Sequence, residues 1–485
     1  MPVSPARKIA YQILLRMESG HGFAVDLLHT PEVSALKEAD RRFATEIVMG
    51  VWRWRGELDF QIEHLSGKKG KVFDSEVRTI LRMGVYQIRF LERVPKRAVV
   101  DDAVELTKAA RKRSAAGLVN AVLRKCEPPN DRMHGRDFER LSAENRESVR
   151  RAFPAWLLKR WERITARGAV DLPLSIGALD VTALGRAPRA TTTDQHCELE
   201  AMQLAYASLA TPRTTLRVVD TGASLQDIQQ ELQAEGVVTS PCQYAAAHGL
   251  TVESGQVQNT RAFREGRVVI QDEASQLVAE LVSPEPGVRV LDLCAAPGMK
   301  AGQLAQMLGA GTVVACDRSA ARLRTMATLL PPWVPAGVRL SMVRLDATRA
   351  LPFAVKFDRI FLDAPCSGTG TLARNPEIKW RLRPEDITRL AELQATMLRN
   401  GLSALANGGR LVYATCSLEP EENEGVVEKV LSEQPAFRVL TSHELSLKHP
   451  HLIPFFDSRG YFRTRPDQHS MDGFNAAVMV RQGSE

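Results

Sequence analysis

Two cysteines in the C-terminal half of the sequence each follow a short apolar run. Residues 357–362 (FDRIFL) lead into Asp363-Ala364-Pro365-Cys366, and residues 411–414 (LVYA) lead into Thr415-Cys416-Ser417. Runs of this length and composition are typical of buried strands in a parallel sheet. Because ligands in open α/β sheets bind beyond the carboxyl ends of the strands, we expect both thiols and Asp363 to face one pocket.

Two thiols and a carboxyl group are the parts that methylation of a pyrimidine at carbon 5 requires. Carbon 5 is too weak a nucleophile to attack a sulfonium methyl group unaided, but thiolate addition at carbon 6 converts the ring into an enamine that can attack. A carboxyl group at the ring nitrogen would stabilise the adduct, and a base must then remove the carbon 5 proton. Methylation of an exocyclic amine typically uses an Asn/Asp-Pro-Pro-aromatic turn, and residues 363–366 do not match it. The spacing alone does not decide which thiol attacks.

A third predicted strand end has the composition of a nucleotide-binding loop. The run at 288–293 leads into Cys294-Ala295-Ala296-Pro297-Gly298-Met299-Lys300, where small residues and a glycine allow close backbone approach. The spacing is not G-x-G-x-x-G, which disfavours a dinucleotide. Asp317 and Asp346 follow the next two predicted strands, where they could bind ribose hydroxyls and an adenine amino group. Each acid alone could be a turn residue, but the ordered series, completed by Asp363, indicates an S-adenosylmethionine site.

The elements that position these groups divide the chain into three predicted domains. Residues 1–145 carry apolar side chains at helical spacing and predict an all-α bundle of six to seven helices. Residues 146–260 predict a linker and a small α/β subdomain, with a loop insertion at 165–205. Residues 261–485 alternate strand and helix, which predicts a Rossmann-like α/β domain whose mostly parallel sheet is covered on both faces. The expected fold class is therefore multidomain.

The net charge of +7 is unevenly distributed along the chain. Residues 1–150 hold 28 Lys and Arg against 21 Asp and Glu, whereas the remaining 335 residues hold 36 of each. The excess could form an electrostatic footprint for a polyanion such as RNA, or simply a solvated helical surface. Trp52 and Trp54 could stack on bases, but packing between helices is the more common role of such residues, and we expect that role.

Composition also excludes several classes of protein. No run of about 18 uncharged apolar residues is present, and the N-terminus lacks the pattern of a signal peptide. The seven cysteines form no CxxC pair and no zinc-type spacing, so we expect free thiols, no metal and a cytoplasmic protein. Cys126, Cys197 and Cys242 have no partner pattern and are expected to be structural. Cys294 and Cys316 are also expected to be buried structural thiols.

Longer motifs around the two cysteines resemble a known family. CAAPGMK at 294–300, DAPCSGTGTLARNPEIKW at 363–380 and ATCSLEPEENEGVV at 414–427 are similar to the Nol1/Nop2/Sun family of RNA cytosine-5 methyltransferases. The N-terminal segment, in stretches such as ARKIAYQILLRM and DRRFATEIVMGVWRWRGELD, resembles the NusB-like RNA-binding domain. The combination resembles bacterial members of the family that act on 16S ribosomal RNA.

The resemblance implies roles that spacing cannot assign. It implies that Cys416 is the nucleophile, that Cys366 assists product release, and that Asp363 lies near both cytosine and cofactor. It further implies that residues 294–300, Asp317 and Asp346 bind S-adenosylmethionine. The implied product is 5-methylcytidine in 16S rRNA. A monomer is the default expectation. Alternatives are the same chemistry on tRNA or another RNA, or a non-catalytic RNA-binding or ribosome-assembly factor.

Four features depart from the family pattern or oppose the chemistry. Met299 stands where the family has Gly, which would crowd the cofactor unless the side chain points away. Val219 replaces an Asn, and Asn475 replaces an aromatic residue. The acidic run at 419–424 would raise the pKa of Cys416 if it lay close, so we expect these carboxylates to point along a helix and away from the sulfur.

Overall fold

The computed structural model describes residues 3–68, 73–128, 138, 140–168, 193–219 and 222–482. The chain forms two compact units. Unit 1 comprises residues 1–165, 190–210 and 372–381, and unit 2 comprises residues 166–189, 211–371 and 382–485. The predicted insertion at 165–205 falls largely outside the described residues, and the three predicted domain ranges stay predictions.

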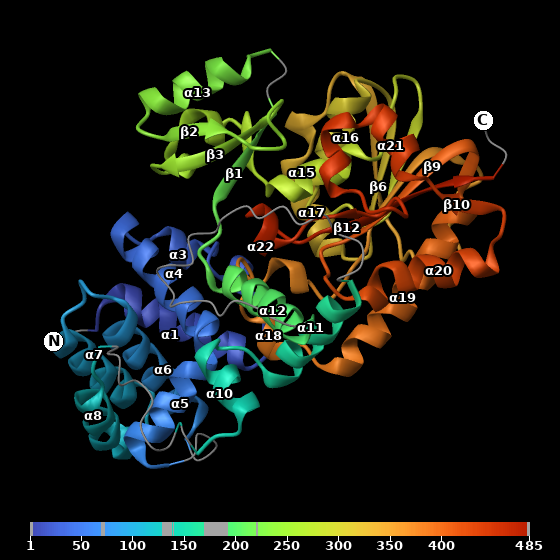
Figure 1. The fold of residues 1–485 in the computed structure, drawn as a ribbon. Helices are drawn as coiled ribbons and strands as arrows, with labels where there is room; N and C mark the ends of the chain where they lie inside the picture. Colours follow the sequence, from blue (N-terminus) through green and yellow to red (C-terminus); the bar gives the residue numbers. More distant parts are fainter. Residues whose placement is uncertain are drawn as a thin grey trace. The chain divides into compact units, whose positions relative to one another are not determined.

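The described residues of unit 1 form helices and no strand, which agrees with the all-α bundle predicted for residues 1–145 (Figure 1). Its helices are α1 (Pro5–Glu18), α2 (Ala24–Leu27), α3 (Pro31–Ser34), α4 (Glu38–Arg53), α5 (Arg55–Ser66), α6 (Ser75–Phe90), α7 (Lys96–Ala109), α8 (Ala116–Lys125), α10 (Ala143–Arg150), α11 (Ala155–Gly168), α12 (Thr193–Leu209) and α18 (Ile378–Arg381).

Helix α6 contributes buried residues to the core of unit 1 along almost its whole length. Val77, Leu81 and Val85 repeat at four-residue intervals and are at most 3% exposed. On α4, Gly50 lies against the Tyr86 ring, so that any side chain there would collide with it. Trp52 is buried in the same core, which confirms the expectation that it packs rather than stacks on bases.

A ten-residue segment from the C-terminal half, residues 372–381, belongs to unit 1. Lys379 and Trp380 donate hydrogen bonds to the carbonyls of Arg53 and Trp52, at 3.0 and 2.8 Å. Arg381 donates to the carbonyls of Gly22 and Met17. The last carbonyls of a helix lack partners within it, so this segment completes the C-terminal ends of α1 and α4. Nothing in the sequence pattern predicted this insertion.

Unit 2 contains a small antiparallel sheet with the strand order β2-β3-β1-β4. Helix α13 starts at a capping box in which Ser224 and Asp227 exchange hydrogen bonds. The elements are β1 (Thr214–Val218), α13 (Leu225–Ala234), β2 (Val238–Pro241), β3 (Gly249–Ser254), α14 (Arg261–Arg264) and β4 (Val268–Ile270).

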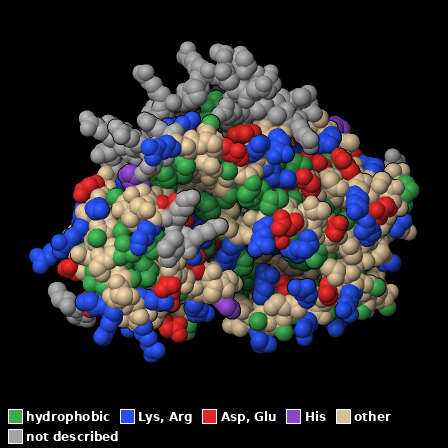
Figure 2. Space-filling model, turned by 90° about the horizontal axis from the view of Figure 1, so that it is seen from below, with side chains coloured by type: hydrophobic (Ala, Val, Ile, Leu, Met, Phe, Trp, Pro, Cys, Tyr) green, Lys and Arg blue, Asp and Glu red, His purple; other side chains and the backbone are tan. Residues whose placement is uncertain are grey.

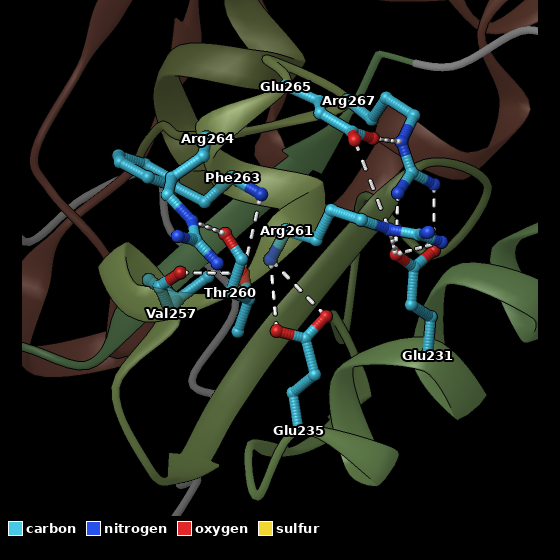
Figure 3. A network of polar contacts seen from close by, with 9 residues as sticks. All are labelled: Glu231, Glu235, Val257, Thr260, Arg261, Phe263, Arg264, Glu265 and Arg267. Carbon is cyan, nitrogen blue, oxygen red and sulfur yellow. Dashed lines mark hydrogen bonds and ion pairs between the residues drawn. The ribbon is translucent and has the colours of Figure 1, made fainter.

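Two arginines beside this small sheet share one carboxylate. Glu231 on α13 accepts hydrogen bonds from the guanidinium groups of Arg261 and Arg267 (Figure 3). The hydrogen bond from Arg267 is the largest cause that lowers the pKa of Glu231 to about 2. One carboxylate thus offsets part of the positive charge of two arginines.

The large sheet of unit 2 has the order β10-β12-β9-β8-β5-β6-β7, with β11 paired to β12. Strands β7, β6, β5, β8 and β9 are parallel, while β12 runs antiparallel to β9, which confirms the predicted mostly parallel sheet. The elements are α15 (Glu273–Glu280), β5 (Arg289–Asp292), α16 (Met299–Leu308), β6 (Ala310–Asp317), α17 (Ala320–Leu329), β7 (Gly337–Arg344), β8 (Phe357–Asp363), α19 (Pro384–Ser403), β9 (Leu405–Thr415), α20 (Glu424–Glu433), β10 (Phe437–Val439), α21 (Ser442–Lys448), β11 (Phe462–Arg463), α22 (Pro466–His469) and β12 (Asn475–Arg481).

Helices bury both faces of this sheet. Along β9, Val412 and Ala414 join an apolar cluster with residues of α15 and α16, while Leu411 and Tyr413 join another with residues of α19 and α20. Alternation of this kind follows from the two-residue period of a strand. Since both faces are covered, the ends of the strands are where a ligand can reach this sheet.

The surface carries charges of both signs. On the face shown in Figure 2, Lys and Arg side chains are interspersed with Asp and Glu side chains. Several basic residues of unit 1 form ion pairs, as Lys96 does with Glu127 and Lys112 with Asp74. The predicted electrostatic footprint for RNA stays a prediction. Within the described ranges, no helix is long and apolar enough to cross a membrane.

Candidate active site

The strand order places the predicted site residues at one edge of the large sheet. Strand β5 lies between β6 and β8, so the order of connection reverses at β5, and crevices at such switch points are where α/β sheets bind ligands. Asp317 ends β6, Asp363 ends β8, and Asp346 follows β7 by two residues. The segment named the loop 294–300 consists of the turn after β5 and the first two residues of α16, and Cys416 follows β9.

Two arginines from other elements donate hydrogen bonds to backbone carbonyls of the loop 294–300. Arg217 of β1, itself buried, donates a hydrogen bond to the carbonyl of Met299 at 3.2 Å. Arg322 of α17 donates to the carbonyl of Ala296 at 2.8 Å. Gly298 has a φ of +111°, and a Cβ there would lie 2.9 Å from Met326, so this turn requires glycine.

Two departures from the family pattern have a packing explanation. Val219 is buried in an apolar cluster that includes Ala295 and Ala296, and the partly buried Met299 side chain packs against the same cluster. Hydrophobic contacts with this cluster therefore hold the Met299 side chain. The sequence could not distinguish this from crowding of the cofactor.

Asp317 and Asp346 each organise a turn with one carboxylate oxygen. Oδ1 of Asp317 accepts a hydrogen bond from the Ser319 amide at 2.7 Å. Oδ1 of Asp346 accepts from the hydroxyl and the amide of Thr348, and these bonds lower the pKa of Asp346. These hydrogen bonds fix the direction of each carboxyl group. Asp317 and Asp346 are therefore turn residues, as the sequence allowed, and they also lie at or just beyond strand ends.

Lys300 and Asp363 form an ion pair between the loop 294–300 and the end of β8. Nζ of Lys300 lies 2.7 Å from Oδ2 of Asp363 and 4.9 Å from the centre of the Phe474 ring. Burial alone would lower the pKa of Lys300, but the charge and hydrogen bond of Asp363 outweigh it and the pKa is raised. Lys300 is therefore a firm cation that holds the Asp363 carboxylate in place.

The two thiols lie together at the ends of β8 and β9. The Sγ atoms of Cys366 and Cys416 are 3.3 Å apart, and both residues are partly buried. The hydrogen bond with Cys416, burial, and the nearby carboxylates of Glu422 and Asp363 raise the pKa of Cys366 well above its usual value. Cys366 is consequently a protonated thiol at neutral pH in the resting protein.

Cys294 and Cys316 have different surroundings from this pair. Cys316 is fully buried in the core, and burial raises its pKa to about 12. Burial also raises the pKa of Cys294 well above its usual value. Both are neutral thiols. Cys126 and Cys242 are buried in apolar clusters, in agreement with a structural role, and the side chain of Cys197 lies outside the described residues.

Asp292, at the end of β5, is a site residue that the sequence reasoning missed. It is 1% exposed; its Oδ1 accepts from the Cys294 amide at 3.3 Å, and its Oδ2 has no hydrogen-bond partner among the described residues. Burial, and secondarily the charge of Asp363, raises its pKa to about 8. An acid at the last position of an otherwise apolar strand was the available signal.

The acidic run at 419–424 contradicts the expectation that its carboxylates point away from the thiols. Glu422 is fully buried and accepts hydrogen bonds from Ser367 and Ser417, the residues that follow the two cysteines. Asn475, the other departure from the family pattern, donates to the carbonyl of Ser417 at 2.7 Å. The turn that carries Cys416 is thus held by polar contacts that its sequence did not reveal.

Known proteins match this chain along nearly its full length. The "Probable ribosomal RNA small subunit methyltransferase B" of Synechocystis sp. is 30% identical over 98% of this chain and 99% of that one. The "Ribosomal RNA small subunit methyltransferase B" of Pseudomonas putida is 32% identical over 87% of this chain and 88% of its own. The chain belongs to the RsmB/F family. The family pattern described as 16S rRNA methyltransferase RsmB/F matches residues 279–480, and that of the NusB family matches residues 4–128.

The fold agrees with this membership. The crystal structure of PH0851 superposes with a TM-score of 0.74, covering 99% of this chain and 100% of that one at 22% identity. RsmB/F methyltransferases depend on S-adenosylmethionine. The site suits this cofactor, because Oδ2 of the buried Asp292 lies at the end of β5 without a hydrogen-bond partner among the described residues, and Asp317 and Asp363 end the two neighbouring strands.

Proposed function

We propose that the protein methylates carbon 5 of a specific cytidine in 16S ribosomal RNA through a covalent Cys416–cytosine intermediate. The observation that carries the proposal is the 3.3 Å separation of the Cys366 and Cys416 sulfurs beside the Lys300–Asp363 ion pair. A retired site in a pure binding factor has no physical need for that arrangement. The RNA class is supported by the relatives, which are ribosomal RNA small subunit methyltransferases.

The residues around β5, β6 and β7 are proposed to hold S-adenosylmethionine, which supplies the methyl group when bound. The loop 294–300 is assigned the close backbone approach that Gly298 permits. Asp317 is assigned the ribose hydroxyls and Asp346 the adenine amino group, by their order along the strands. Asp363 is shared with the base, and Lys300 keeps its carboxylate oriented.

The proposed chemistry uses the two thiols in turn. The Cys416 thiolate adds to carbon 6 of the cytosine, while the Asp363 carboxyl group stabilises the ring nitrogen by sharing a proton. Carbon 5 then takes the methyl group. Cys366, after losing its own proton to solvent, accepts the proton from carbon 5, whose bonding pair forms the carbon 5–carbon 6 double bond. The carbon 6–sulfur pair returns to Cys416 as thiolate, and one proton is released overall.

Substrate and setting follow from the same proposal. A base inside a stack is out of reach of the thiols, so the target cytidine must be flipped out or unpaired. Ribosomal RNA as substrate supports a cytoplasmic location. Every group that the proposed chemistry uses comes from one chain, which supports a monomer. Size-exclusion chromatography with light scattering tests that state directly.

The test is methylation by wild type and two cysteine variants. Small-subunit rRNA, tRNA and labelled S-adenosylmethionine are incubated with each protein, and nucleosides are identified by mass spectrometry. We expect label in 5-methylcytidine of the rRNA for wild type and none for Cys416→Ala. Cys366→Ala should accumulate a protein–RNA adduct that survives a denaturing gel. Label only in tRNA would overturn the substrate, and full activity of Cys416→Ala would overturn the mechanism.

A further inference from the structure

One buried carboxylate joins the two loops that carry the cysteines. Glu422 is fully buried, and its Oε1 accepts a hydrogen bond from the Ser367 amide at 2.9 Å. Its Oε2 accepts from the hydroxyls of Ser367 and Ser417, the latter at 2.6 Å. Ser367 directly follows Cys366, and Ser417 directly follows Cys416. Glu422 thus forms hydrogen bonds with the residue that directly follows each cysteine.

Gln394 extends this link to the other side of Cys366. Its Nε2 donates to Oε1 of Glu422 and to the carbonyl of Pro365, both at 2.9 Å. The Tyr413 hydroxyl in turn donates to Oε1 of Gln394 at 3.1 Å. Gln394 and Tyr413 lie on α19 and β9, which are packed elements of the core. The backbone on both sides of Cys366 is therefore fixed to a rigid support through Glu422 and Gln394.

The donors around Glu422 explain how an ionised carboxylate is tolerated at this depth. Two hydroxyl groups, one amide N–H of the backbone and one side-chain amide donate to its two oxygens. Buried charges are stable when they are hydrogen-bonded in this way, and loss of the acceptor leaves buried donors unpaired. Hydrogen bonds of this kind, with an ionised acceptor, are also stronger than neutral ones and hold geometry well.

We propose that Glu422 is a positioning residue that sets the spacing of Cys366 and Cys416 and thereby controls release of the methylated base. The inference rests on the proposed function, in which Cys416 forms the adduct and Cys366 resolves it. Glu422 reaches neither base nor cofactor itself; it acts through the two serines that follow the cysteines.

Release is the step that depends most on the distance between the sulfurs. Cys416 is then bonded to carbon 6, and the sulfur of Cys366 must reach the proton on the adjacent carbon 5. As that proton moves to Cys366, its bonding pair forms the ring double bond and the carbon 6–sulfur pair returns to Cys416. A misplacement of about 1 Å can slow a positioned reaction by about 100-fold. Attack by Cys416 alone needs no such pairing and should be less affected.

The charge of Glu422 provides a second readout. It is one of the groups that raise the pKa of Cys366, the others being the Cys416 thiol, the Asp363 carboxylate and burial. Tyr413 also interacts with Cys366, and Lys300 with Cys416. Replacing Glu422 by a neutral residue of the same shape should move the limb of the rate profile that reports Cys366 to lower pH. A residue with a merely structural role would leave that limb in place.

The experiment compares Glu422→Gln with wild type and with Glu421→Gln. Glu421 is the exposed neighbour on the same turn, so its variant removes the same charge without touching the link. Each full-length protein is incubated with labelled small-subunit rRNA and S-adenosylmethionine. The covalent adduct is followed on denaturing gels over time, kcat and KM for RNA are measured, and thermal unfolding checks the fold. Ser417→Ala, which deletes one donor and keeps the carboxylate, serves if Glu422→Gln unfolds.

For Glu422→Gln we expect the adduct to form and to decay about 10- to 100-fold more slowly than in wild type. Its kcat should fall by a similar factor while KM for RNA stays within about 2-fold of wild type, and its pH limb should shift to lower pH. Glu421→Gln should behave as wild type. A folded Glu422→Gln protein with wild-type decay, or one that forms no adduct, would overturn the proposal. Absence of adduct in wild type and in Cys366→Ala would instead overturn the proposed function.

Discussion

Replacing the buried acid at the end of β5 should change the pH dependence of stability in a defined direction. Asp292→Asn preserves shape, and its side-chain oxygen can still accept the hydrogen bond from the Cys294 amide. Burial raises the pKa of Asp292 to about 8 in the folded protein, against about 4 for an unfolded aspartate. Above pH 4 the unfolded chain therefore releases a proton that the folded chain retains. Wild-type stability falls as the pH rises from 4 to 8 and levels off above 8.

The size of the effect follows from the shift. When the folded state binds one proton more than the unfolded state, the free energy of unfolding falls by about 1.4 kcal/mol for each unit of increase in pH. Between pH 5 and pH 8 wild type should lose about 3.6 kcal/mol from this group, because the folded carboxyl group is itself half ionised at pH 8. Asparagine does not ionise, so Asp292→Asn should gain about that much relative to wild type over the same interval. Other titrating groups are common to both proteins and cancel in the comparison.

Hydrogen exchange at pH 5 and pH 8 is the suitable assay, because a chain with two units need not unfold in one step. Amides of β5 and β8 report the opening free energy of the large sheet. Asp358→Asn is the control, since Asp358 is a partly exposed acid near the opposite end of β8. An Asp292→Asn protein whose stability relative to wild type is the same at both pH values would refute the reasoning, as would a variant that is less stable than wild type at pH 8.

Two further substitutions test packing contacts, one within unit 1 and one within unit 2. Trp380→Ala removes the indole that donates to the Trp52 carbonyl. It should lower the opening free energy of unit 1 by about 2–4 kcal/mol, measured by hydrogen exchange of the α4 amides. Unchanged exchange would contradict the role of residues 372–381. Gly370→Ala places a methyl group against the carbonyl of Gly473, so it should lower the free energy of unfolding by about 1–3 kcal/mol and reduce methylation. Gly117→Ala is the control, because its methyl group meets no atom within 4 Å and should change neither quantity. Equal behaviour of the two variants would contradict the close contact.

Much of the site was predictable because its signals are local. An apolar strand followed by Asp363 or Cys416 indicates by its order alone that the group lies at a carboxyl strand end. The parallel sheet then brings such ends to one edge, and the Sγ atoms of Cys366 and Cys416 are indeed 3.3 Å apart. The choice of Cys416 over Cys366 as nucleophile has no such local signal. It came from the resemblance and stays a proposal.

The sequence by itself determined the fold class, the strand ends and the types of the reacting groups, because strand periodicity and turn composition are properties of neighbouring residues. Only the tertiary structure decided which polar side chains form hydrogen bonds with the turns and helix ends around the reacting groups and in unit 1. The sequence predicted that the Glu422 carboxylate points along a helix and away from the thiols, yet it is buried between Ser367 and Ser417. Lys379 and Trp380 cap helix ends more than 300 residues away in the chain. Such contacts depend on where distant segments pack, since a carboxylate or a carbonyl accepts any donor that the fold brings near it, and no local pattern names that donor.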